Sequence, residues 1–155
     1  MDKSKGKKKD YINAWNFAKD YDHSKTLNEI KEYFDYLENK EFVDDVGLHL
    51  QICIKKSRPM YIHGYVLTSA LHHYLKNNDV NGITILETGT ARGFSAICMS
   101  KILKDLNKDG IIHTFDILSL KKEMYWNCIN DIINGKCLRG DLLNKWSDLK
   151  DYIKL

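Results

Sequence analysis

A segment near the middle of the chain joins an apolar strand pattern to a glycine turn and then to a helical pattern. Ile83, Ile85 and Leu86 form a short apolar run that is typical of a strand covered on both faces. The apolar spacing then becomes helical, at Phe94, Ile97, Cys98, Ile102, Leu103 and Leu106. The order of strand, tight turn and helix indicates an α/β arrangement for this part of the chain.

The turn itself is typical of a cofactor-binding loop. Gly89 and Gly93 have no Cβ, so the backbone there can take positive φ and a ligand can approach it closely. The amides that open the following helix carry partial positive charge. We therefore expect an anionic group of a ligand to lie beside this turn.

The spacing of the glycines narrows the choice of ligand. A dinucleotide fingerprint needs glycine at the first, third and sixth positions, which here hold Gly89, Ala91 and Phe94. A phosphate loop ending in Gly-Lys-Ser/Thr is also absent, because Phe94 and Ser95 follow Gly93. The pattern therefore disfavours NAD and nucleoside triphosphates.

What remains is the pattern acidic-x-Gly-x-x-x-Gly-x-Ser from Glu87 to Ser95, followed by a second predicted strand, 111–115, that ends in Asp116. This combination resembles class I S-adenosylmethionine-dependent methyltransferases, and within them the small-molecule O-methyltransferases of the catechol and macrocin type. The resemblance covers roughly residues 60 to 120. It implies a Rossmann-like fold in which N-terminal helices precede the first two parallel strands of an incomplete sheet.

The resemblance also implies roles for individual residues. Glu87 would hold the methionyl amino end of S-adenosylmethionine, Gly89 and Ala91 would let the backbone approach it, and Ser95 would lie by its carboxylate. Asp116 would accept hydrogen bonds from the ribose hydroxyls, which suits a carboxylate at a strand end. The expected cofactor-binding set is completed by Thr88, Thr90, Gly93 and, at the rim, His63.

Each of these side chains has a simpler interpretation. Glu87 could be solvated or cap the next helix, and Asp116 could be a turn residue. Arg92, inside the loop, could reach an anionic substrate or lie solvated at the surface. His63, beside a glycine, could be a base or a loop residue with a satisfied hydrogen bond.

The composition of the chain indicates its size class, its compartment and the kinds of partner that it can bind. The chain has 155 residues, 43% of them hydrophobic, which suits one domain with a real core. Its formal charge is +3, with a lysine-rich start that we expect to be a mobile tail over residues 1–10. Because no aromatics interleave with these lysines and no long apolar run occurs, we expect no nucleic-acid or membrane partner. Four widely spaced cysteines suggest reduced, mostly packed thiols. Because there is neither an apolar run of membrane-spanning length nor a signal-peptide pattern after the basic start, we expect a cytoplasmic protein.

The organisation is helical first. Residues 11–80 should form a helical region, with one helix over about 26–39, a second ending before Pro59 and a third carrying Leu67 to Leu75. Residues 81–155 should form the cofactor-binding part. Apolar spacing suggests a further helix within 120–133 and a final amphipathic segment within 142–152.

By the resemblance, a complete protein would have a seven-stranded sheet, and the third strand would begin near Tyr152 or Ile153. We therefore expect the chain to be the N-terminal part of such a fold. The catalytic residues stay unknown, and a divalent metal in the complete protein would take its ligands from outside this chain; no metal site is predicted within it. The first strand would have an open edge, which a second copy or another partner could close.

These observations predict methyl transfer from S-adenosylmethionine to a small-molecule acceptor, with oxygen as the expected nucleophile. Two alternatives stay open. One is a short protein that binds S-adenosylmethionine or a partner without catalysis, and the other is a nucleotide-dependent oxidoreductase.

Overall fold

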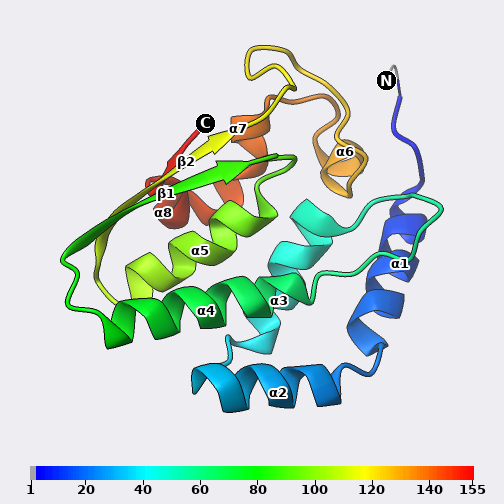
Figure 1. Ribbon diagram of the computed structural model, residues 1–155. Coiled ribbons are helices and arrows are strands. Elements are labelled where there is room, and N and C mark those ends of the chain that lie inside the picture. Colours follow the sequence, from blue (N-terminus) through cyan, green and yellow to red (C-terminus); the bar gives the residue numbers. More distant parts are fainter. Residues whose placement is uncertain (1–2) are drawn as a thin grey trace.

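The computed structural model describes residues 3–155 and combines helices with a three-stranded sheet (Figure 1). In chain order the elements are α1 Lys8–Asp20, α2 Ser24–Phe34, α3 Lys40–Val46, the π-helical turn η1 Gly47–Gln51, α4 His63–Asn77, β1 Gly82–Thr88, α5 Phe94–Asp105, β2 Asp109–Phe115, α6 Asn130–Ile133, α7 Arg139–Leu142, the 3-10 turn η2 Asn144–Trp146, α8 Ser147–Lys150 and β3 Ile153–Lys154.

The sheet is parallel, with the order β1-β2-β3. Ile85 pairs with Ile112, and Ile112 pairs with Ile153 on its other side. The two strands expected from the sequence are confirmed, and the third begins at Ile153, one of the two expected positions. The structure is thus of a mixed α/β kind, with β1 at one edge of the sheet.

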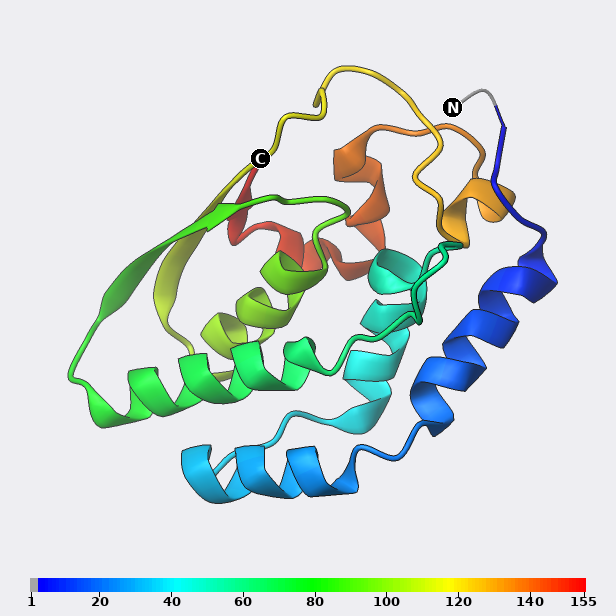
Figure 2. The ribbon, with the colours of Figure 1, turned by 45° about the vertical axis from the view of Figure 1, so that its right-hand side comes forward.

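Residues 3–155 cover only one face of the sheet. Gly110 of β2 lies against Leu103 of α5, where an added Cβ would be 2.9 Å from Leu103 Cδ1. On the opposite face Leu86 is 73% exposed and Phe115 is 59% exposed. Figures 1 and 2 show the helices gathered on one side of the strands. The expectation that β1 is covered on both faces is therefore wrong for this structure.

The first helix begins earlier than the sequence suggested. Residues 8–10, assigned to the mobile tail, form the first turn of α1, where the Asp10 carboxylate accepts a 2.7 Å hydrogen bond from the Lys7 amide. An acidic group in the first turn of a helix stabilises it. Tyr11 is fully buried, and its hydroxyl lies 3.3 Å from Ser4 Oγ. Residues 1 and 2 of the predicted tail lie outside the described part of the chain.

The helical region differs in detail from the prediction. The helix expected over 26–39 ends at Phe34, because Asp35 takes a left-handed conformation with φ 52°. A new helix, α3, starts after Asn39, whose side chain accepts a 3.1 Å hydrogen bond from the Phe42 amide. The second expected helix is thus α3 continued by η1, and the third is α4.

Of the helix expected within 120–133, only the last four residues are helical, as α6. The Asp131 carboxylate accepts hydrogen bonds of 2.7 Å from the amides of Trp126 and Asn127, which holds these residues in a turn. Met124 and Cys137 form an isolated antiparallel bridge, and only the short α6 follows the turn. The amphipathic segment at 142–152 is likewise divided among α7, η2 and α8.

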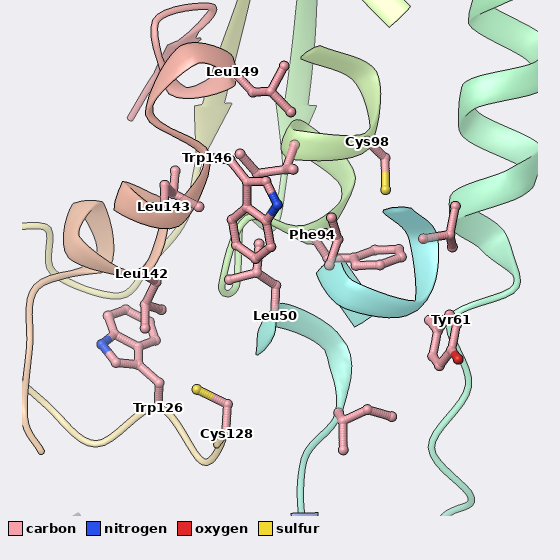
Figure 3. Packing of buried hydrophobic residues seen from close by; sticks show 14 of the residues in the cluster. Leu50, Tyr61, Phe94, Cys98, Trp126, Cys128, Leu142, Leu143, Trp146 and Leu149 are labelled. Carbon is pink, nitrogen blue, oxygen red and sulfur yellow. The ribbon is translucent and has the colours of Figure 1, made fainter. Parts of the chain in front are cut away.

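The largest core cluster joins the N-terminal helices to the strand-containing half (Figure 3). Phe94 at the start of α5 and Leu50 of η1 belong to it together with Trp126, Leu143 and Trp146. Cys98, Cys128 and Cys137 are buried and Cys53 is half-buried, and all four are free thiols as expected. Among residues 3–155, no helix has both the length and the apolarity to span a membrane.

Candidate functional site

The loop between β1 and α5 has the backbone that the sequence predicted. Gly89 has φ 82° and Gly93 has φ 90°, so both take the conformation that glycine allows most easily. Ala91 between them also has a positive φ, of 47°. For an L-residue this conformation costs about 1–2 kcal/mol, which indicates that the surrounding contacts impose the loop's shape.

The two glycines serve different purposes. A Cβ added at Gly89 would meet no atom within 4 Å, so the space beside this residue is open to a ligand. A Cβ at Gly93 would lie only 2.8 Å from Leu143 Cδ2. Gly93 therefore lets the start of α5 pack closely against the segment after α7, whereas Gly89 leaves room at the surface.

A hydroxyl chain connects Glu87 to the loop. Thr114 Oγ1 donates to the Glu87 carboxylate at 2.5 Å and lies 2.6 Å from Thr90 Oγ1. Because a hydroxyl has a single proton, Thr90 must be the donor to Thr114. Burial raises the pKa of the Glu87 carboxyl, while hydrogen bonds from Thr114 and Ser95 act in the opposite direction. Glu87 is thus held in place rather than freely solvated.

Asp116 lies directly after β2 and contacts the same loop. Its Oδ2 accepts a 2.7 Å hydrogen bond from the Ala91 amide, and its Oδ1 accepts one of 2.8 Å from the Leu118 amide. Arg139 Nη2 lies 3.5 Å from Oδ1. Burial alone would raise the pKa of Asp116, but the two amides and the Arg139 charge outweigh it and hold the pKa below its ordinary value.

His63 is the first residue of α4 rather than a loop residue. Its ring lies 4.8 Å from the ring of Phe94, centroid to centroid, which places it beside the first turn of α5. Burial, and to a smaller degree the charge of Lys55, lowers the pKa of His63, so the imidazole is neutral near pH 7. His63 therefore lies at a helix end beside Phe94, and its place at the rim of a cofactor site stays a prediction.

Arg92 is neither solvated nor available to a substrate. Its Nε donates to the Leu50 carbonyl at 2.6 Å, while its two terminal nitrogens each donate over 3.1 Å to the carbonyls of Trp126 and Gln51. The guanidinium thus caps the end of η1 and ties it to the turn at Trp126. Both interpretations that the sequence left open for Arg92 are wrong.

The remaining expected residues lie around the same loop. Ser95 is the second residue of α5, half-buried beside Glu87, and Thr88 is exposed at the end of β1. The structure brings together eight of the expected residues, which are Glu87, Thr88, Gly89, Thr90, Ala91, Gly93, Ser95 and Asp116. His63 contacts the ring of Phe94 but none of these eight. Within residues 3–155 no group of three or more His, Cys, Asp or Glu side chains is arranged to hold a metal ion.

Two participants were missed by sequence reasoning. Thr114 connects Glu87 to Thr90, and Arg139 contacts Asp116. Thr114 stands at the second position before Asp116, on the covered face of β2, and could have been found from strand alternation. Nothing near Arg139 in the sequence signals its contact with Asp116.

The site lies at the carboxyl ends of two adjacent parallel strands, which is where α/β proteins bind ligands. The fold and the loop thus define a three-stranded parallel α/β unit with a glycine loop at its strand ends. Searches of protein-family models, curated protein sequences and solved structures found no match to the chain.

Proposed function

We propose that the chain binds S-adenosylmethionine at the loop from Glu87 to Ser95 and serves methyl transfer to a small-molecule acceptor, with oxygen as the nucleophile. The observation that carries the proposal is the hydrogen bond from the Ala91 amide to Asp116, because it joins the glycine loop to the acidic end of the next strand. Both acidic side chains that the resemblance assigns to the cofactor thus border one loop.

The residues of the loop suit the cofactor's groups. Glu87 carries the carboxylate that would hold the ammonium of the methionyl end, and the first amides of α5 would face its carboxylate. The open space at Gly89 gives room for close approach to the backbone. Asp116 accepts two hydrogen bonds from the chain and faces the Arg139 guanidinium, while an ionised carboxylate has about four acceptor positions, so it retains capacity for a ribose hydroxyl.

When bound, S-adenosylmethionine supplies an electrophilic methyl group on a sulfonium. The acceptor oxygen must approach this methyl group in line and lose its proton, so the chain's contribution is chiefly to orient the two reactants. Burial lowers the pKa of His63, which is therefore neutral near pH 7 and lies against Phe94 in the first turn of α5.

A second function is favoured by the uncovered sheet face. Leu86 and Phe115 are exposed there, and β1 has an edge that no strand of the described chain pairs with. Exposed apolar side chains beside an open edge are typical of surfaces that pair with another chain. A non-catalytic protein that binds S-adenosylmethionine and a partner, or a homo-oligomer, would also have these features.

Amide NMR spectra of the uniformly ¹⁵N-labelled chain would test the proposal. Titration with S-adenosylhomocysteine should shift the amides of residues 87–95 and 116–118 and leave α1 and α2 unchanged. NAD should cause no saturable shift, because the glycine spacing does not fit a dinucleotide. Saturable shifts confined to other elements would contradict the proposed site, and shifts with NAD alone would favour the oxidoreductase alternative.

A further inference from the structure

Arg139 is the largest fully buried side chain among the described residues, with 1% of its surface exposed. It is the first residue of α7, and its Cζ lies 5.4 Å from the centre of the Trp126 ring. Its Nη2 donates to the Leu118 carbonyl at 3.3 Å and lies 3.5 Å from Asp116 Oδ1. Its Nε and Nη1 have no protein partner within residues 3–155.

A buried guanidinium is costly unless an anion faces it. Asp116 is the carboxylate that does so here, and its own side chain is only 9% exposed. The contacts close a ring: Asp116 accepts from the Leu118 amide, the Leu118 carbonyl accepts from Arg139, and Arg139 faces Asp116. The other oxygen of Asp116, Oδ2, accepts a hydrogen bond from the Ala91 amide. The orientation of this carboxylate is therefore defined from both sides.

We infer that Arg139 is a positioning residue, which fixes the carboxylate of Asp116 at the end of β2 so that its remaining acceptor position faces a ribose hydroxyl. This inference rests on the proposed adenosyl site and adds to it a residue outside the glycine loop. Arg139 acts through Asp116 and does not touch the ligand. The planar guanidinium packs against the indole of Trp126 while facing a carboxylate, which a lysine ammonium does less well.

The test is to compare Arg139→Gln, Arg139→Lys and wild type in calorimetric titrations with S-adenosylhomocysteine and with its analogue lacking the 2′ and 3′ hydroxyls. Arg139→Gln should weaken binding of S-adenosylhomocysteine by roughly 10–100-fold, as expected if the misplaced Asp116 loses its charged hydrogen bond with the ribose. Binding of the dideoxy analogue should change by less than about twofold, and Arg139→Lys should give an intermediate loss. Lys136→Gln, an exposed cation three residues earlier, is the matched control and should bind like wild type.

Equal losses for both ligands would show a structural role only and would overturn the inference, as would unchanged affinity in Arg139→Gln. If Arg139→Gln fails to fold, Asp116→Asn is compared with Asp116→Asn/Arg139→Gln, which removes both charges together. Arg139 acting through Asp116 predicts equal affinity in these two proteins, whereas a further loss in the double variant would contradict it. Absence of binding by folded wild type would instead refute the proposed function, and the inference with it.

Discussion

The backbone N–H of Ala91 donates a 2.7 Å hydrogen bond to Oδ2 of Asp116, 25 positions further along the chain. Ala91 lies in the loop after β1 and Asp116 directly after β2, so this bond joins the ends of two adjacent strands. A carboxylate that stabilises a left-handed alanine in this way is part of the loop's structure. The same carboxylate is the group that we expect to meet the ribose.

Asp116→Ala should weaken binding of S-adenosylhomocysteine by about 1–3 kcal/mol, since a charged acceptor is lost. Asp116→Asn should have a smaller effect, because the amide oxygen can still accept one hydrogen bond. Calorimetric titration of both variants checks the prediction, with circular dichroism to confirm that each is folded. Wild-type affinity in Asp116→Ala would exclude a ribose contact at this residue.

Ala91→Gly should stabilise the protein by roughly 0.5–1 kcal/mol. The substitution removes about 1–2 kcal/mol of left-handed strain, while the greater freedom of glycine in the unfolded chain returns about 0.4–1 kcal/mol. Urea unfolding measures the change. Ala70→Gly, within α4, is the control and should destabilise by about 0.5–1 kcal/mol. Destabilisation by Ala91→Gly would mean that the methyl group makes a contact that outweighs the strain.

Gly93→Ala should destabilise the fold by about 1–3 kcal/mol, from strain at φ 90° and crowding of the fully buried Leu143. Gly135→Ala is a matched control, because Gly135 has φ 71° and no atom within 4 Å of an added Cβ. The difference between the two variants, measured by urea unfolding, reports the crowding alone. Equal losses would show that close packing against Leu143 contributes nothing.

Glu87→Gln should stabilise the protein at pH 7 while weakening ligand binding. Burial raises the pKa of Glu87 in the folded state. Between the unfolded and the folded pKa of this carboxyl, the folded protein therefore binds more protons than the unfolded chain, and its stability falls as pH rises. The neutral amide avoids that loss. The gain should therefore be largest above the folded pKa and disappear below about pH 4, the ordinary range of a glutamate. A gain that does not depend on pH would assign the effect to packing instead.

The strand, turn and helix from Ile83 to Leu106 were predictable from local patterns. The periodicity of apolar residues, the glycines of a turn and the caps of a helix each depend on only a few neighbouring residues. Contacts between distant segments were not predictable. Arg92 binds carbonyl groups 34 to 42 positions away, which no local pattern indicates. The helix expected within 120–133 is confined to α6, because Asp131 accepts hydrogen bonds from the amides of Trp126 and Asn127, a side-chain effect that overrides apolar spacing.

The same distinction applies to the site. Glu87, Gly89 and Asp116 were predicted as site residues from the motif and from their places at a strand end or in a turn, and the structure confirms those places. Arg139 was not, because its partner lies in another element and an arginine among polar residues has no distinguishing pattern. The exposure of Leu86 could likewise not be predicted, because the sequence of a strand does not show whether helices cover one face of its sheet or both.

The most direct test of the adenosyl site is a calorimetric titration of S-adenosylhomocysteine into wild type, Gly89→Val and Gly135→Val. Gly89 and Gly135 both have positive φ and open space around an added Cβ, so the two substitutions impose similar backbone strain at different places. The account predicts saturable binding by wild type and Gly135→Val and no binding by a folded Gly89→Val. Equal binding by all three proteins, or no binding by folded wild type, would contradict it.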